Sequence, residues 1–161
     1  MLMANDHKLM HSMAASPAAR RNHHAFRGGL WEHSLDVVKA AEGIAAVYPQ
    51  VDRDLLVTGA LLHDIGKVEE YQVNGGIDFT DAGRLLGHIV MGVGIVDSFI
   101  ARLAGFPEGL RLKLLHMIVS HHGRYEWQSP KKPKFLEADI LHQLDMIDSR
   151  VDMYNKAGNG P

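Results

Sequence analysis

The sequence predicts an all-α fold, a bundle of about six helices with a small β-hairpin insertion. Apolar residues recur at helical spacing through most of the chain. Proline or a capping residue stands before several of these periodic segments, where a helix can begin. A single segment alternates apolar and polar residues around a turn, and it supplies the only strand signal. These three observations favour one helical domain.

The composition bounds the function more than the fold. The chain has 161 residues, 46% of them hydrophobic, which is enough for one ordinary core. Its formal net charge of −2 gives no chain-wide positive field for nucleic acid, so any contact with phosphate must be local. The absence of cysteine excludes disulfides, zinc ribbons and thiol nucleophiles. No apolar run has signal-peptide or membrane-spanning length, so we expect a cytoplasmic protein without a membrane partner.

We expect one domain over residues 1–161. It would consist of an N-terminal helical extension at 1–22, a core at 23–156 and a frayed tail at 157–161. In the extension, Lys8 to Ala19 has a helical pattern that Ser16-Pro17 interrupts, as if a helix restarted there.

The first helices of the core are marked by apolar periodicity. One is expected from about Trp31 to Val47. Asp52 can cap the next, whose residues Leu55 to Leu62 are apolar almost all round, so this helix should be central. His63 and Asp64 end it. The segment Glu70 to Thr80 then alternates about an Asn-Gly-Gly turn and predicts the hairpin.

Three further helices complete the predicted bundle. Asp81 can cap one that runs to about Ala104, and Pro107 marks the break after it. The following helix should run from Glu108 to His121 or His122. Pro133 opens the last helix, which is amphipathic.

Side chains that can bind metals stand at predicted helix ends or on inward faces. Such groups are costly in a core unless they are paired or bound to a metal. Histidine is the commonest protein ligand for metals, and the chain has 11 of them. The candidates are His33, His63, Asp64, His88, His121, His122 and Asp145.

Some of these assignments stay open on the sequence alone. His121 and His122 are about 100° apart on a helix, so both reach one ion only if the helix ends there. Gly123 suits such an end, but one of the two histidines would otherwise be structural. His142 can be a packed core histidine or a partner of a ligand, and we leave it outside the site. Asp148 can accept a hydrogen bond from a ligand or be solvated.

The order of these residues resembles the HD superfamily of metal-dependent phosphohydrolases, in which the segment His63-Asp64-Ile65-Gly66-Lys67 would be the namesake motif. Residues 23–33, 120–123 and 141–148 resemble, more narrowly, the catalytic HD domain of the YhaM-type 3′-5′ exoribonucleases. The resemblance covers roughly Pro17 to Tyr154.

The resemblance implies one or two divalent metal ions in the core. His33, His63, Asp64 and Asp145 would hold the first ion, and His88, His121 and His122 the second, with Asp64 bridging. The second site varies within the family between one-metal and two-metal members. Mixed oxygen and nitrogen ligands favour Mn²⁺ or Fe²⁺, with Mg²⁺, Co²⁺ and Ni²⁺ as alternatives.

The resemblance also implies hydrolysis of a phosphodiester by a metal-bound hydroxide, on single-stranded RNA or short oligonucleotides. Asp64 and Lys67 would be the catalytic residues, with Lys67 neutralising a phosphate oxygen. Gly66 either permits the close approach of a ligand or ends a helix. Two basic clusters, around Arg20 and from Arg124 to Lys134, can line a phosphate track or simply be solvated.

Three other functions remain open. They are a nucleotide phosphomonoesterase, an HD-type di-iron oxygenase and a non-catalytic metal-binding HD module that docks a partner. The YhaM-type enzymes carry an OB-type nucleic-acid-binding domain ahead of the HD domain, where this chain has about 20 residues. We therefore expect either a fragment or a small member that acts on shorter phosphoesters. A homo-oligomer is compatible with the sequence.

Overall fold

The computed structural model describes residues 3, 5–20, 25–73 and 76–158. In this part of the chain there are six helices of nine residues or more, one single-turn helix, one 3₁₀ turn and one hairpin. The elements are α1 (His7–Ala15), α2 (Gly29–Val47), α3 (Arg53–Leu62), α4 (Lys67–Glu70), β1 (Tyr71–Val73), β2 (Ile77–Phe79), α5 (Asp81–Ile100), α6 (Glu108–Ser120), η1 (Tyr125–Trp127) and α7 (Leu136–Lys156). The predicted all-α bundle with a small hairpin is confirmed.

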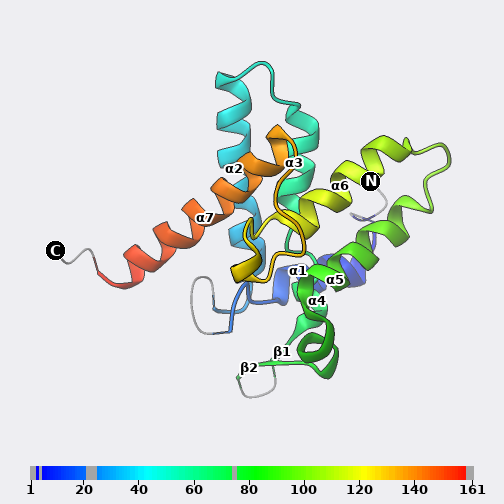
Figure 1. The fold of residues 1–161 in the computed structure, drawn as a ribbon. Helices are drawn as coiled ribbons and strands as arrows, with labels where there is room; N and C mark the ends of the chain where they lie inside the picture. Colours follow the sequence, from blue (N-terminus) through cyan, green and yellow to red (C-terminus); the bar gives the residue numbers. More distant parts are fainter. Residues whose placement is uncertain (1–2, 4, 21–24, 74–75, 159–161) are drawn as a thin grey trace.

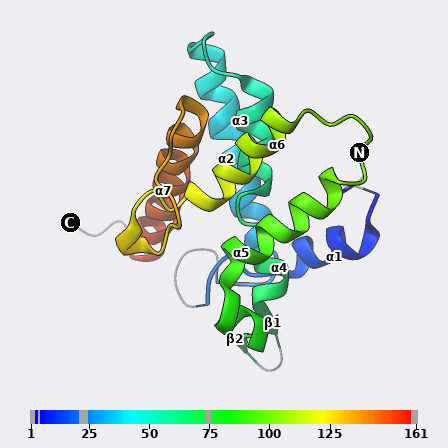
Figure 2. The ribbon, with the colours of Figure 1, turned by 45° about the vertical axis from the view of Figure 1, so that its right-hand side comes forward.

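Three of the longer helices pack around α3, as its apolar sequence predicts. α2, α6 and α7 all contact α3, while α5 packs on α4 and α6. Leu56 and Ala60 of α3 are buried together with Met117 of α6 and Leu141 of α7. Burial of a leucine side chain contributes about 1.5–3 kcal/mol, so this layer is a main source of stability. Figures 1 and 2 show the hairpin and the α2–α3 turn at opposite ends of the molecule.

Several helix ends follow the predicted capping rules. The Asp52 side chain accepts a hydrogen bond from the backbone N–H of Leu55, which confirms it as the cap of α3. The hairpin pairs Tyr71 with Phe79 in antiparallel register. Thr80, rather than Asp81, caps α5, because its hydroxyl accepts from the Gly83 N–H.

Other predicted ends were wrong. α1 ends at Ala15, and no helix restarts at Ser16-Pro17. Ser16 is instead extended, and its carbonyl accepts the N–H of Leu30 in the first turn of α2. α5 ends at Ile100 instead of Ala104, and α7 begins at Leu136, three residues after Pro133.

α5 is long and apolar enough to cross a membrane by length and composition alone, although fewer than half of the residues in its most apolar stretch are buried. The core helix of a soluble protein passes the same test. α5 contacts both α4 and α6, and its backbone leaves the helical conformation at Gly87, where φ is 74°. The contacts with α4 and α6 make α5 a packed element of the bundle.

Two predicted features lie partly outside the described residues. These are the basic cluster around Arg20, of which residues 21–24 are not described, and the tail, of which residues 159–161 are not.

Candidate metal centre

The structure brings the seven predicted ligand residues to one point between the helices. His33 lies on α2, His63 caps the end of α3 and Asp64 follows it. The other four come from the second half of the chain. They are His88 on α5, His121 and His122 at the end of α6, and Asp145 on α7.

The first group surrounds one carboxylate oxygen of Asp64. His33 Nε2 lies 3.1 Å from His63 Nε2, and both lie 3.5 Å from Asp64 Oδ2. Asp145 Oδ1 closes the group at 3.2 Å from His33 Nε2 and 3.8 Å from His63 Nε2. His33, His63 and Asp64 are almost fully buried. These four residues can offer two nitrogens and two carboxylates to one ion.

The second group surrounds the other oxygen of the same carboxylate. Asp64 Oδ1 lies 3.5 Å from His88 Nε2 and 3.5 Å from His121 Nε2. One ring nitrogen from each of His88, His121 and His122 lies within 4.8 Å of the others. Asp64 therefore faces both groups, one oxygen to each, as a bridging carboxylate does.

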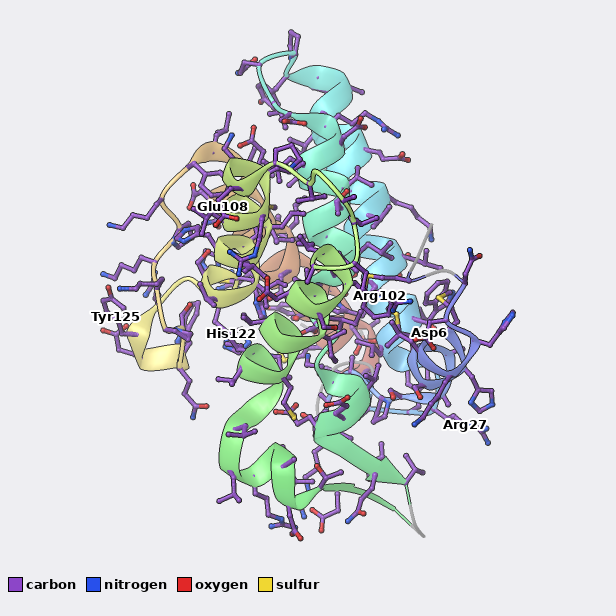
Figure 3. The ribbon with its side chains drawn as sticks, turned by 90° about the vertical axis from the view of Figure 1, so that its right-hand side faces the viewer. Asp6, Arg27, Arg102, Glu108, His122 and Tyr125 are labelled. Carbon is purple, nitrogen blue, oxygen red and sulfur yellow. The ribbon has the colours of Figure 1, made fainter. Side chains whose placement is uncertain are left out.

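The end of α6 lets both His121 and His122 face the centre. The helix ends at Ser120, and Gly123 has a φ of 75°, a left-handed conformation that glycine adopts without strain. A Cβ at Gly123 would also stand 2.3 Å from the ring of His142. Figure 3 shows His122 beside α5 and Tyr125 at the outer edge of the loop that follows.

His142 contributes to this turn, although we left it outside the site. Its Nδ1 donates to the backbone oxygen of His121 at 2.7 Å, and its ring is buried. It lies one turn before Asp145 on α7, so one helix both supplies a ligand and braces the turn that carries two others.

The five histidines present the same ring nitrogen to the centre. In each ring Nδ1 lies within hydrogen-bond distance of an outer oxygen, which can only accept, so Nδ1 carries the proton. The acceptors are Asp148 Oδ2 for His33 at 2.6 Å, the Ala60 oxygen for His63 at 2.8 Å, Glu70 Oε1 for His88 at 3.1 Å, the Ile118 oxygen for His121 at 2.7 Å and the Trp127 oxygen for His122 at 2.8 Å. In the neutral rings Nε2 is then a bare lone pair, the form that binds metals.

Bare acceptors facing one another are the strongest indication that cations fit here. Asp64 Oδ1, His88 Nε2 and His121 Nε2 are buried and have no hydrogen-bond partner in the described part of the chain. Lone pairs on nitrogen and oxygen repel at this distance unless a positive charge lies between them. These unpartnered atoms therefore suit a divalent cation in the second group, and the two nitrogens and two carboxylates of the first group are ligands of the same kind.

The pKa values of both carboxylates and of two histidines in the second group favour the protonation states that bind metal. Burial opposes ionisation of Asp64, but the charge of Lys67 holds its pKa well below the usual value. Burial likewise opposes ionisation of Asp145, whose pKa is nevertheless lowered, first by a hydrogen bond from His33. Burial lowers the pKa of His121 and brings that of His122 to about 4, so both rings are neutral at pH 7.

His33 behaves differently in the absence of metal. Burial alone would lower its pKa, but hydrogen bonds to Asp145 and Asp148 and the charge of Asp64 raise it to about 9. At neutral pH the His33 ring therefore carries a second proton, on Nε2, close to Asp145 Oδ1 and His63 Nε2. This proton occupies the place that a metal ion in the first group would take.

Lys67 lies beside the centre. Its ammonium donates to Asp64 Oδ2 at 2.5 Å, and the side chain is almost completely buried. Lys67 and Asp64 line a cavity of about 310 Å³, which we call the central cavity; its walls also include His88, His122, Asp145 and Met146. Gly66 does not face a ligand, because a Cβ there would stand 1.9 Å from the backbone oxygen of His88. It permits the close packing of α4 on α5.

Comparisons with a family model and with known proteins agree on one family. The family model for the HD domain matches residues 30–150. The 3′-5′ exoribonuclease YhaM of Bacillus subtilis (strain 168) is 43% identical over 141 residues, which are 88% of this chain and 45% of that protein. The YhaM protein of Geobacillus sp. (strain WCH70) is 41% identical over 88% of this chain and 43% of its own length. That of Listeria monocytogenes serotype 4b (strain CLIP80459) is 42% identical over 87% of this chain and 44% of its own length.

The chain thus spans less than half the length of these curated relatives. No solved structure matches it significantly.

Proposed function

Because this chain belongs to the HD-domain family, we propose that it is a metal-dependent phosphohydrolase that removes nucleotides from the 3′ end of single-stranded RNA. One observation carries the proposal: the two oxygens of the buried Asp64 each lie 3.5 Å from two histidine nitrogens of a different group. A carboxylate bridging two cations is the arrangement used for in-line displacement at phosphorus. The relatives named as 3′-5′ exoribonucleases support the direction of cleavage and the RNA substrate.

The donor set suits Mn²⁺ or Fe²⁺ best, because five imidazoles and two carboxylates mix nitrogen and oxygen ligands. When bound, such ions would activate a water molecule at neutral pH and offset the charge of a phosphate. The histidines and carboxylates of the two groups would hold these ions, and the activated water would then replace a serine or cysteine nucleophile.

The residues of the central cavity supply the remaining functions. Lys67 can donate to a phosphate oxygen, because its ammonium already lies beside Asp64 and lines the cavity. The Nδ1 acceptors keep all five rings fixed, so binding needs little rearrangement of the protein. Ala18, Ala19 and Met146 form apolar parts of the cavity wall, which limits the water around the reacting phosphate.

The test is degradation of a 5′-labelled single-stranded RNA by the Mn²⁺-loaded protein. We expect a ladder of products that shortens from the 3′ end, and no products in chelator. Asp64→Ala should lose metal and activity together. Asp54→Ala is the matched control, since Asp54 is 90% exposed at the start of α3. Full activity and metal content in Asp64→Ala would overturn the assignment.

A second candidate is a nucleotide phosphomonoesterase. The central cavity of about 310 Å³ lies at the small end of ligand sites and suits one nucleotide. A panel of nucleoside mono-, di- and triphosphates distinguishes the two functions: release of inorganic phosphate from the panel, without shortening of RNA, favours this candidate.

A further inference from the structure

A second, larger cavity adjoins the central cavity along the hairpin. Its volume is about 740 Å³, and it shares Tyr71, His88 and His122 with the central cavity. We call it the hairpin groove. It extends from these shared residues to Arg20, Phe79 and the N-terminal part of α5. A ligand bound at the metal centre can therefore continue into the groove without leaving the protein surface.

Two arginines lie side by side in the groove. Arg84 donates to Asp78 Oδ2 at 2.9 Å, and Arg20 lies 3.4 Å from Asp78 Oδ1. Asp78 thus pairs with two guanidinium groups, and these three side chains together carry one net positive charge, while the nearby Glu70 carboxylate is bonded to His88. Both arginine side chains are about half exposed, at 42% and 54%, so some of their N–H groups face solvent. Paired guanidiniums of this kind suit phosphate oxygens.

Aromatic and apolar surface lies next to these charges. The rings of Tyr71 and Phe79 lie 5.1 Å apart at a tilt of 39°, and the Arg20 guanidinium lies 5.9 Å from the Phe79 ring. Leu86 and Val90 of α5 also line the groove and are more than half exposed. Cationic groups beside aromatic rings are the usual means of binding a single strand without reading its sequence.

The other basic cluster also places cations beside aromatic rings, but the cavity it lines contains no ligand histidine. Arg124 lies over the ring of Trp127 at 4.8 Å, and Lys132 lies over Tyr125 at 5.2 Å. Both cations therefore stack on aromatic residues of their own loop. The cavity that they line shares Trp127 with the central cavity but includes none of the ligand histidines, whereas the hairpin groove includes two.

We propose that the hairpin groove binds the nucleotides on the 5′ side of the scissile phosphate of a single-stranded RNA. Arg20 and Arg84 contact backbone phosphates there, and Tyr71 and Phe79 offer ring surface to a base. The terminal nucleotide occupies the central cavity, which is less than half the size of the groove. This inference rests on the proposed function for its substrate, but its central claim is a binding event that can be measured without hydrolysis.

The test compares wild type with Arg20→Gln, Arg84→Gln and the double variant. Arg53→Gln is the control, because Arg53 is also an exposed arginine paired with carboxylates, and it begins α3 at the opposite end of the molecule. Equilibrium binding of Mn²⁺-loaded protein to a labelled oligoadenylate with phosphorothioate linkages, which resist hydrolysis, is followed at several salt concentrations. Steady-state hydrolysis of the normal RNA and of bis(4-nitrophenyl) phosphate is measured in parallel.

We expect each single variant to weaken RNA binding about threefold to tenfold and to reduce the slope of log K against log salt by about 0.7. KM for RNA should rise while hydrolysis of the small ester and the metal content stay unchanged. Unchanged RNA affinity and salt slope in the double variant would contradict the proposal that the groove binds RNA. A wild type that does not bind RNA would contradict it as well. Loss of all hydrolysis with intact, arginine-dependent RNA binding would instead count against the proposed function alone.

Discussion

Glu70 fixes His88 through a single carboxylate oxygen. Glu70 Oε1 accepts the backbone N–H of His88 at 2.9 Å and lies 3.1 Å from its Nδ1. The first bond is available because the backbone is non-helical at Gly87, so the following N–H has no partner within α5. Burial opposes ionisation of Glu70, but its bonds with His88 lower its pKa. The carboxylate is therefore charged and orients the ring.

We predict that Glu70→Ala weakens binding at the second group about 10- to 100-fold and leaves the first group occupied. Glu70→Gln should weaken it less, because the amide oxygen still accepts from Nδ1. Metal content after dialysis and titration of the apoprotein with Mn²⁺ measure both. Glu69→Ala is the control, since Glu69 is exposed on the same turn. Equal loss of both ions in Glu70→Ala would show a general folding defect and contradict a positioning role.

Gly66 provides a test of stability separate from metal binding. A Cβ there would stand 1.9 Å from the His88 oxygen and 2.6 Å from the Gly92 nitrogen, and backbone atoms cannot move aside cheaply. We expect Gly66→Ala to lower the free energy of unfolding by more than about 2 kcal/mol. A Cβ at Gly94 would have no atom within 4 Å, and alanine favours the helix over glycine, so Gly94→Ala should raise the free energy of unfolding by about 0.5–1 kcal/mol. Urea denaturation in chelator measures both, and a wild-type midpoint for Gly66→Ala would refute the close packing of α4 on α5.

The role of Lys67 can be tested by comparing its ion pair with Asp64 to a surface ion pair of the same sequence spacing. Lys67→Ala should keep its metals, since Asp64 still faces both groups, and should lower RNA hydrolysis about a hundredfold by removing a donor to phosphate. Lys39→Ala breaks an equivalent i,i+3 pair with Asp36 on the surface and should change neither quantity. Metal analysis beside kcat separates the outcomes. Loss of metal in parallel with rate would assign Lys67 to maintaining Asp64 rather than to the substrate.

Much of this centre follows from local sequence, and the rest depends on contacts between distant segments. Asp52 as a cap and the paired His63-Asp64 after an apolar helix are local features, so they could be predicted. Glu70 and His142 could not be assigned, because each acts on a residue 18 or 21 positions away. The break at Gly87 was missed because glycine within an apolar helix gives no signal of its φ. Gly66 was interpreted either as room for a ligand or as a helix end, whereas it stands directly before α4 and packs against the backbone of α5.

The short bond between His33 and Asp148 predicts how metal binding depends on pH. Asp148 Oδ2 lies 2.6 Å from His33 Nδ1, and together with Asp145 and Asp64 it overcomes burial to raise the pKa of His33 to about 9. Without metal, the proton on His33 favours the folded state fully below the ordinary pKa of 6.5, and this contribution is lost as pH rises through about 9. A metal ion must displace that proton.

We therefore expect the affinity for Mn²⁺ at the first group to rise with pH between 7 and about 9 and then to level off, with about one proton released from His33 per ion at pH 7. Calorimetry in buffers of different ionisation enthalpy measures the release. Asp148→Asn weakens a hydrogen bond that raises the pKa of His33, so fewer protons should be released per ion at pH 8 and the plateau should begin at lower pH. Asp139→Asn, on the exposed face of the same helix, should leave the profile unchanged. Affinity that is independent of pH in this range would mean that His33 is already neutral in the metal-free protein.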